Sequence, residues 1–133
     1  MKVEKYSPPL NDRVPKVMFT PSEFSYEGNA GSGENWQSIG NWLYSLIEGR
    51  NVPTPEMSAL VERLTEGAED DMEKIRRLYV YLGQNTRYVS IQLGLGGLRP
   101  IAPESVFKNK FGDCKALTLF LQTLFVYVAE GVE

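Results

Sequence analysis

The stretch Phe111-Gly112-Asp113-Cys114-Lys115-Ala116-Leu117 contains a glycine, which is expected to interrupt regular structure, followed by the start of a long apolar run. Cys114 is the only cysteine of the 133 residues, and the sequence contains no histidine. The pattern places Cys114 at the N-terminus of a helix, where the helix dipole favours the thiolate. This position predicts a nucleophile. From composition alone, a single cysteine is more typical of a small buried apolar residue.

The helix that begins at Cys114 is apolar nearly all the way round, which is typical of a helix buried on every side. Its apolar residues are Ala116, Leu117, Leu119, Phe120, Leu121, Leu124, Phe125, Val126 and Val128. Asp113 is expected to be its N-cap and to accept a hydrogen bond from the Ala116 N–H. Too few elements precede this helix to cover it. We therefore expect the front part of a larger domain, with self-association through a face containing Phe120, Leu124 and Phe125.

Three amphipathic helices are expected ahead of it. The first carries apolar residues at helical spacing from Trp36 to Ile47, with both tryptophans in the core. The second is capped by Thr54, has Pro55 as its first residue and ends at Gly67. The third begins with Asp70 and Glu73 in capping-box spacing and extends through Leu82. Its expected surface ion pairs are Asp70 with Lys74 and Glu73 with Arg77.

The residues on either side of these helices suggest strands, turns and a lead-in. Alternation over residues 88–93 predicts a half-buried strand, and the glycines at 94, 96 and 97 predict a turn with positive φ. A short helix is expected from Pro103 to Phe107. Residues 1–35 are expected to be an extended, Pro- and Gly-rich lead-in or the end of a preceding domain, with one short strand at 16–19. Residues 36–133 form the expected core.

Several of these segments together resemble the transglutaminase-like superfamily, whose bacterial members carry this core behind a β-rich domain. The resemblance covers roughly residues 36–125 and rests on Asn85-Thr86-Arg87-Tyr88-Val89-Ser90, Leu93-Gly94-Leu95-Gly96-Gly97, Pro103-Glu104-Ser105-Val106-Phe107 and the Gly-Asp-Cys step at Cys114. It implies an α+β class: the mainly helical N-terminal half of a cysteine-proteinase or transglutaminase-like fold. It also implies that Cys114 is the catalytic nucleophile.

The implied function is that of a cysteine hydrolase or acyltransferase, which acts on amide bonds through a Cys thioester. The implied substrate is a peptide or protein, with cell-wall peptide as one case, and the implied location is the bacterial periplasm or cell envelope. The Cys114 N–H is one expected oxyanion donor, with Tyr88 or Gln92 as the second. The family's later His and Asp or Asn are missing from the sequence, so we expect this chain to be inactive alone. The alternative is a non-catalytic binding or structural module with the same fold.

Composition narrows the partners and cofactors. The net charge is −3, with 14 basic and 17 acidic residues, and no basic cluster is longer than Arg76-Arg77. We therefore expect no nucleic-acid partner. One cysteine and no histidine predict no metal site, and no cofactor is expected. The isolated pair Lys108 and Lys110 is typical of a solvated surface. The first twenty residues lack an apolar core, so we expect a soluble chain without a membrane span.

Overall fold

The computed structural model describes residues 6–129; residues 1–5 of the expected lead-in and 130–133 of the expected core lie outside the described residues. The chain is a mixed α and β protein, as the sequence predicted. Its elements are, in chain order, η1 (Leu10–Asp12), β1 (Glu23–Tyr26), β2 (Asn29–Ser32), α1 (Trp36–Ser45), α2 (Pro55–Thr65), α3 (Asp71–Asn85), β3 (Arg87–Tyr88), η2 (Gly94–Gly97), α4 (Pro103–Asn109), β4 (Phe111–Gly112) and α5 (Cys114–Ala129).

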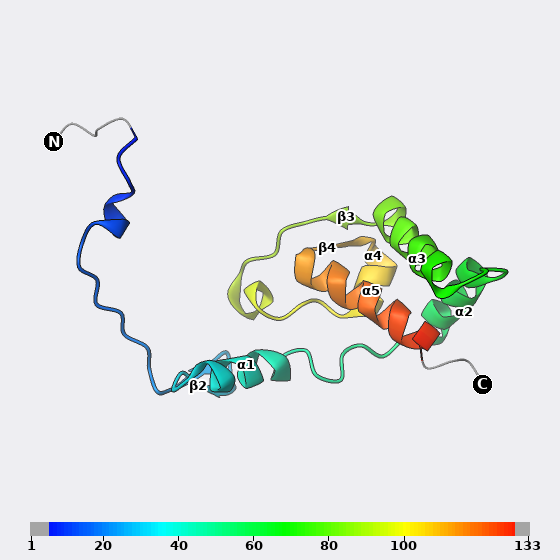
Figure 1. The fold of residues 1–133 in the computed structure, drawn as a ribbon. Coiled ribbons are helices and arrows are strands. Elements are labelled where there is room, and N and C mark those ends of the chain that lie inside the picture. The colour runs from blue at the N-terminus through cyan, green and yellow to red at the C-terminus, as the bar shows by residue number, and fades with distance from the viewer. Residues whose placement is uncertain (1–5, 130–133) are drawn as a thin grey trace.

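The hydrophobic core lies where α2, α3 and α4 pack against α5, on the opposite side of the molecule from the extended N-terminal segment (Figure 1). Phe120 and Leu78 are fully buried, and burial of each such side chain contributes about 1.5–3 kcal/mol. The buried cluster consists of Met57, Val61, Leu78, Val106, Ala116, Phe120 and Leu124. This packing fixes the position and direction of α5.

The expected caps of α2 and α3 are confirmed. Thr54 precedes Pro55 and its Oγ1 accepts the Met57 N–H at 3.4 Å, while Asp70 Oδ1 accepts the Glu73 N–H at 2.8 Å. The Glu73 carboxylate does not complete a capping box. It bonds to Arg77 and also to Arg76, at 2.7 Å each, and the expected Asp70 pair is wrong because Lys74 bonds to Asp71 instead.

The helix α5 begins at Cys114 as predicted, but the expectation of burial on every side is wrong. Cys114, Thr118 and Gln122, each four positions apart, form an exposed stripe, whereas Phe120 and Leu124 are fully buried. The reason is that α2, α3 and α4 cover only one side of α5. Phe120 and Leu124 therefore cannot form the exposed face expected to mediate self-association.

The strand expected over residues 88–93 is wrong in length, because β3 spans Arg87–Tyr88 only. It pairs in parallel with β4, which itself has two residues before the start of α5. β4 ends at Gly112, just before α5, so the residues after Val89 have no backbone partner in β4. The turn that follows has one glycine with positive φ, Gly94 at +53°.

The lead-in contains a β-hairpin, not the strand expected at 16–19. β1 and β2 pair antiparallel around a turn in which Glu27 and Gly28 both have positive φ, at 48° and 80°. The Trp42 ring packs edge-on against Phe24 at 4.9 Å between ring centroids, so α1 lies on the hairpin. Trp36 is 87% exposed, and its expected place in the core is wrong, because α1 faces the hairpin instead of the main core.

Candidate active site at Cys114

Cys114 is the first residue of α5, and its side chain is exposed. The thiol therefore lies at the positive end of the helix dipole and is open to a reagent or substrate. The buried reading that composition favoured is wrong for this residue. The sequence located the residue and its place in the helix from the glycine break before the apolar run, together with the Gly-Asp-Cys step.

Asp113 fixes the start of this helix. Its side chain is 2% exposed, and its Oδ1 accepts the Ala116 N–H at 3.0 Å, as predicted. Its Oδ2 is bound to the ammonium group of Lys115. Burial alone would raise the pKa of the Asp113 carboxyl, but the hydrogen bonds from Lys115 and Ala116 outweigh burial and hold the pKa below its ordinary value. Asp113 is therefore ionised and fully engaged at neutral pH.

The β3–β4 pair holds a second segment beside the thiol. Tyr88 is paired with Gly112, and the Val89 N–H donates to the Gly112 carbonyl at 2.9 Å. Gly112 is buried, and a Cβ at this position would lie 2.9 Å from the Ala116 Cβ. A side chain there would therefore push the strand away from the first turn of α5.

Neither Tyr88 nor Gln92, the two residues expected to supply the second oxyanion donor, is held against the thiol by a hydrogen bond. Tyr88 is 60% exposed, and the Gln92 amide donates to the Ser90 hydroxyl at 3.3 Å. Across residues 6–129, no hydrogen bond joins either side chain to Cys114. The Cys114 N–H belongs to the first turn of the helix, where backbone donors have no intrahelical partner. It is the donor that the fold places at the thiol.

A groove of about 590 Å³ opens beside the thiol, between α1 and the exposed stripe of α5. Sequence periodicity did not indicate this groove, because it joins segments more than 60 positions apart. Its apolar wall comes from the end of α1, from the residues just after α1 and from the segment that follows η2. The wall residues are Leu43, Tyr44, Ile47, Leu98 and Pro100. The Cys114 side chain forms part of the lining.

The lysine pair upstream of the site has structural partners. Lys108 bonds to Glu104 at 2.6 Å on the surface of α4. The Lys110 ammonium donates to the Tyr81 hydroxyl at 3.1 Å and lies 4.2 Å from the Phe107 ring centroid. Lys110 also ends α4 in the left-handed conformation, with φ at 58°. Lys108 therefore lies on the surface, as expected for the pair. Lys110 does not, because its ammonium group links α3 to α4.

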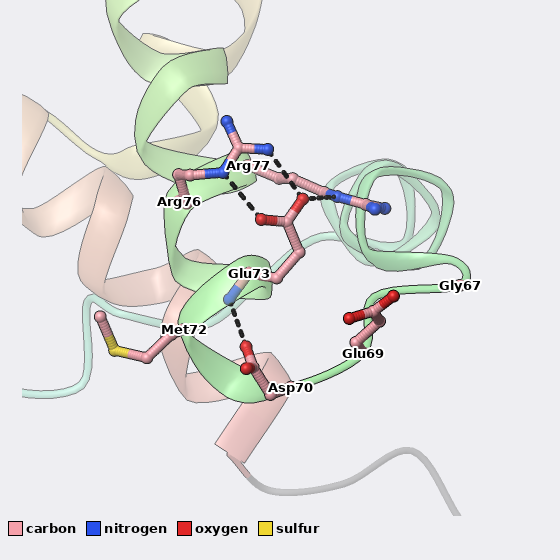
Figure 2. Close-up of a pocket in the computed structure, with 7 residues that line it drawn as sticks. All are labelled: Gly67, Glu69, Asp70, Met72, Glu73, Arg76 and Arg77. Atoms are coloured by element: carbon pink, nitrogen blue, oxygen red, sulfur yellow. Dashed lines mark hydrogen bonds and ion pairs between the residues drawn. The ribbon is translucent and has the colours of Figure 1, made fainter.

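A second hollow lies at the junction of α2 and α3 and is lined by charged residues (Figure 2). Figure 2 shows the Glu73 carboxylate between the guanidinium groups of Arg76 and Arg77. Arg77 also donates to the Glu66 carbonyl at 2.9 Å and the Leu64 carbonyl at 3.3 Å, at the C-terminus of α2. The Arg77 guanidinium is thus occupied in holding α2 and α3 together.

No group of three or more metal-ligating side chains is found within residues 6–129. No helix in that range is both long enough and apolar enough to span a bilayer. Comparisons with protein-family models, curated proteins and solved structures gave no match. The case for a function therefore depends on the residues around Cys114.

Proposed function

We propose that the chain is the cysteine-bearing part of a transglutaminase-like cysteine hydrolase or acyltransferase that acts on amide bonds in peptides or proteins. Cys114 is the nucleophile of this proposal. The observation that carries it is an exposed thiol at the first position of a packed helix, beside an open groove. The motif around Gly112, which resembles that superfamily, supports the same assignment.

The proposed reaction begins when the Cys114 thiolate attacks the amide carbonyl carbon. The C–S bond forms, and the negative charge moves to the carbonyl oxygen near the Cys114 N–H. When the tetrahedral intermediate collapses, the C–N bond breaks and the amine leaves with a proton from a general acid. Water or a second amine then attacks the thioester and regenerates the thiol.

The proton carrier must come from outside residues 1–133 in this proposal. The sequence contains no histidine, and both oxygens of the adjacent Asp113 carboxylate are bound to other groups. The parts played by this chain are to present the thiol, to donate the Cys114 N–H and to provide one side of the substrate site. On its own, the chain is expected to accept an acyl group without turning over amides.

The test is the substitution Cys114→Ala in the longest protein that contains this chain, assayed for release of ammonia or amine from peptide amides. Loss of at least about a thousandfold in rate supports the proposal, since removal of a catalytic nucleophile has effects of this order. Unchanged amide cleavage and crosslinking would refute it. A protein that binds peptides with equal affinity before and after the substitution, and cleaves none, would be the binding module.

A further inference from the structure

The groove beside Cys114 has an apolar wall that faces the reacting atom. Within this groove α1 provides Leu43 and Tyr44, and the residues just after α1 provide Ile47, although all three are far from α5 in the sequence. Leu43 and Leu98 are each 40% exposed, and Tyr44 is 59% exposed. These side chains are therefore available for contact with a bound group.

The charge of the groove favours an uncharged occupant. Among the described residues that line it, Lys115 is the one charged residue, and its ammonium is bound to the Asp113 carboxylate. The other polar lining residues, Thr118 and Gln122, are neutral. A charged group entering the groove would lose hydration without meeting an unpaired opposite charge. An apolar group would remove exposed apolar surface from water.

One long-range hydrogen bond helps to hold the two parts of the apolar wall together. The Glu27 carboxylate, at the tip of the hairpin, accepts the Leu95 N–H at 3.1 Å across 68 positions of the sequence. Leu95 belongs to η2, which leads directly into Leu98 of the groove wall. The hairpin is joined to α1 by the Phe24–Trp42 ring contact and by the Trp42 Nε1–H, which donates to the Asn29 carbonyl at 3.3 Å. Glu27 therefore connects α1 to the segment after η2, the other part of the apolar wall.

We propose that this groove binds an uncharged, apolar side chain of the amide substrate that Cys114 attacks. The inference rests on the proposed function and names its substrate class: amides with an aliphatic or aromatic group close to the reacting carbonyl. α1 and the segment after η2 supply the selectivity. Glu27 is a positioning residue for this groove.

Alkylation of Cys114 tests the groove without requiring catalysis. Cys114 is the only cysteine, so every alkylated molecule is modified at this site. The rates of iodoacetamide and N-hexyl iodoacetamide are each divided by the rate with a small free thiol. The expected result is a normalised preference of about tenfold for the hexyl reagent, the factor given by burying roughly two methylene groups.

A matched pair of leucines provides the control. Leu98→Asp places a charge in the groove and should remove the hexyl preference. Leu93→Asp alters a leucine on the other side of η2 that is 88% exposed and does not line the groove, so the preference should persist. Leu43→Ser examines the α1 wall in the same way. Circular dichroism confirms that each variant is folded.

The outcomes separate the two proposals. Equal normalised rates for both reagents in the unsubstituted chain would overturn the groove assignment and leave the nucleophile intact. Failure of both reagents to modify the folded chain would count against Cys114 as a nucleophile. A hexyl preference that declines as protein concentration rises, together with dimerisation in sedimentation, would show that a second copy occupies the groove and would overturn the substrate assignment.

Discussion

The Asp113 carboxylate is bound to the Lys115 ammonium, so the two charged residues on either side of Cys114 neutralise each other. The other Asp113 oxygen accepts the Ala116 N–H at 3.0 Å. We therefore assign Asp113 to fixing the start of α5, and not to proton transfer with the neighbouring thiol.

Removal of the Asp113 cap is expected to destabilise the fold. Asp113→Ala deletes a buried N-cap and leaves Lys115 without its partner, which should lower the free energy of unfolding by about 1–3 kcal/mol. Asp113→Asn keeps a capping oxygen and should cost less. Urea unfolding measures both, with Asp71→Ala as the control because Asp71 pairs with Lys74 on the exposed face of α3. Equal losses for Ala and Asn would show that the ion pair, not the cap, is responsible.

Two glycines should respond to alanine in opposite directions. Gly112→Ala brings a Cβ to 2.9 Å from Ala116 and 3.4 Å from Leu117, so we expect a loss of about 1–3 kcal/mol from overpacking. Gly83→Ala lies inside α3, where the added Cβ meets no atom within 4 Å beyond its chain neighbours and the backbone of its own helix, and it should stabilise by about 0.5–1 kcal/mol. Thermal and urea unfolding measure the sign of the stability change for each substitution. A stable Gly112→Ala protein would contradict the close approach of β4 to α5.

The Glu73 cluster predicts an acid-sensitive part of the stability. Hydrogen bonds from Arg76 and then from Arg77 lower the Glu73 pKa from 4.5 to about 2. Between these values the unfolded chain binds more protons than the folded chain, so this contribution is complete above 4.5 and is lost as the pH falls towards about 2. Glu73→Gln should remove it.

The measurement for Glu73 is urea unfolding across the acid range. The unsubstituted chain and Glu73→Gln should differ most near neutral pH and converge as the pH approaches about 2. Glu69→Gln is the matched control, because Glu69 lines the same hollow and forms no ion pair within residues 6–129. A constant difference between the unsubstituted chain and Glu73→Gln at every pH would contradict the assignment.

Breaking the contact between the hairpin and η2 should change the selectivity of the groove more than the reactivity of the thiol. Gly94 has φ at +53°, and a Cβ there would lie 2.3 Å from Glu27 Oε1, so Gly94→Ala should break the contact between Glu27 and Leu95. Glu27→Ala removes the same contact from the other side. Both variants should lower the hexyl preference at Cys114 by severalfold and leave the iodoacetamide rate unchanged. A preference that survives both substitutions would show that Glu27 does not position the α1 wall.

The helices were predictable because their signals are local. Thr54 with Pro55, Asp70, and Asp113 before Cys114 each mark a start by chemistry within a few residues. The hairpin carries a weaker local signal, in the Glu27-Gly28 turn between Tyr26 and Asn29, within the segment expected to be an extended lead-in. Its turn type needs positive φ at Glu27, which is unusual for that residue.

The errors concern features that depend on distant partners. The residues after Asn85 alternate between apolar and polar, as in a strand. The pairing strand β4 has only two residues, so the later residues of the alternation have no strand among the described residues to pair with. Trp36 has core-like spacing with Trp42, yet α1 packs on the hairpin and leaves Trp36 exposed. The groove depends on the end of α1 lying across from the exposed stripe of α5, a relationship that periodicity within either helix does not contain. Cys114 itself was found by its motif.

The central claim is that the fold presents Cys114 as a nucleophile, and intact-mass measurement of its acylation tests this most directly. The chain is mixed with p-nitrophenyl acetate at neutral pH, both folded and in urea, and the mass and the released nitrophenolate are followed. The account predicts one acetyl group per chain, none in Cys114→Ala, and a rate in the folded chain at least as high as in urea, because the Cys114 thiol is exposed in the fold. A folded thiol that reacts more slowly than the unfolded one would contradict it.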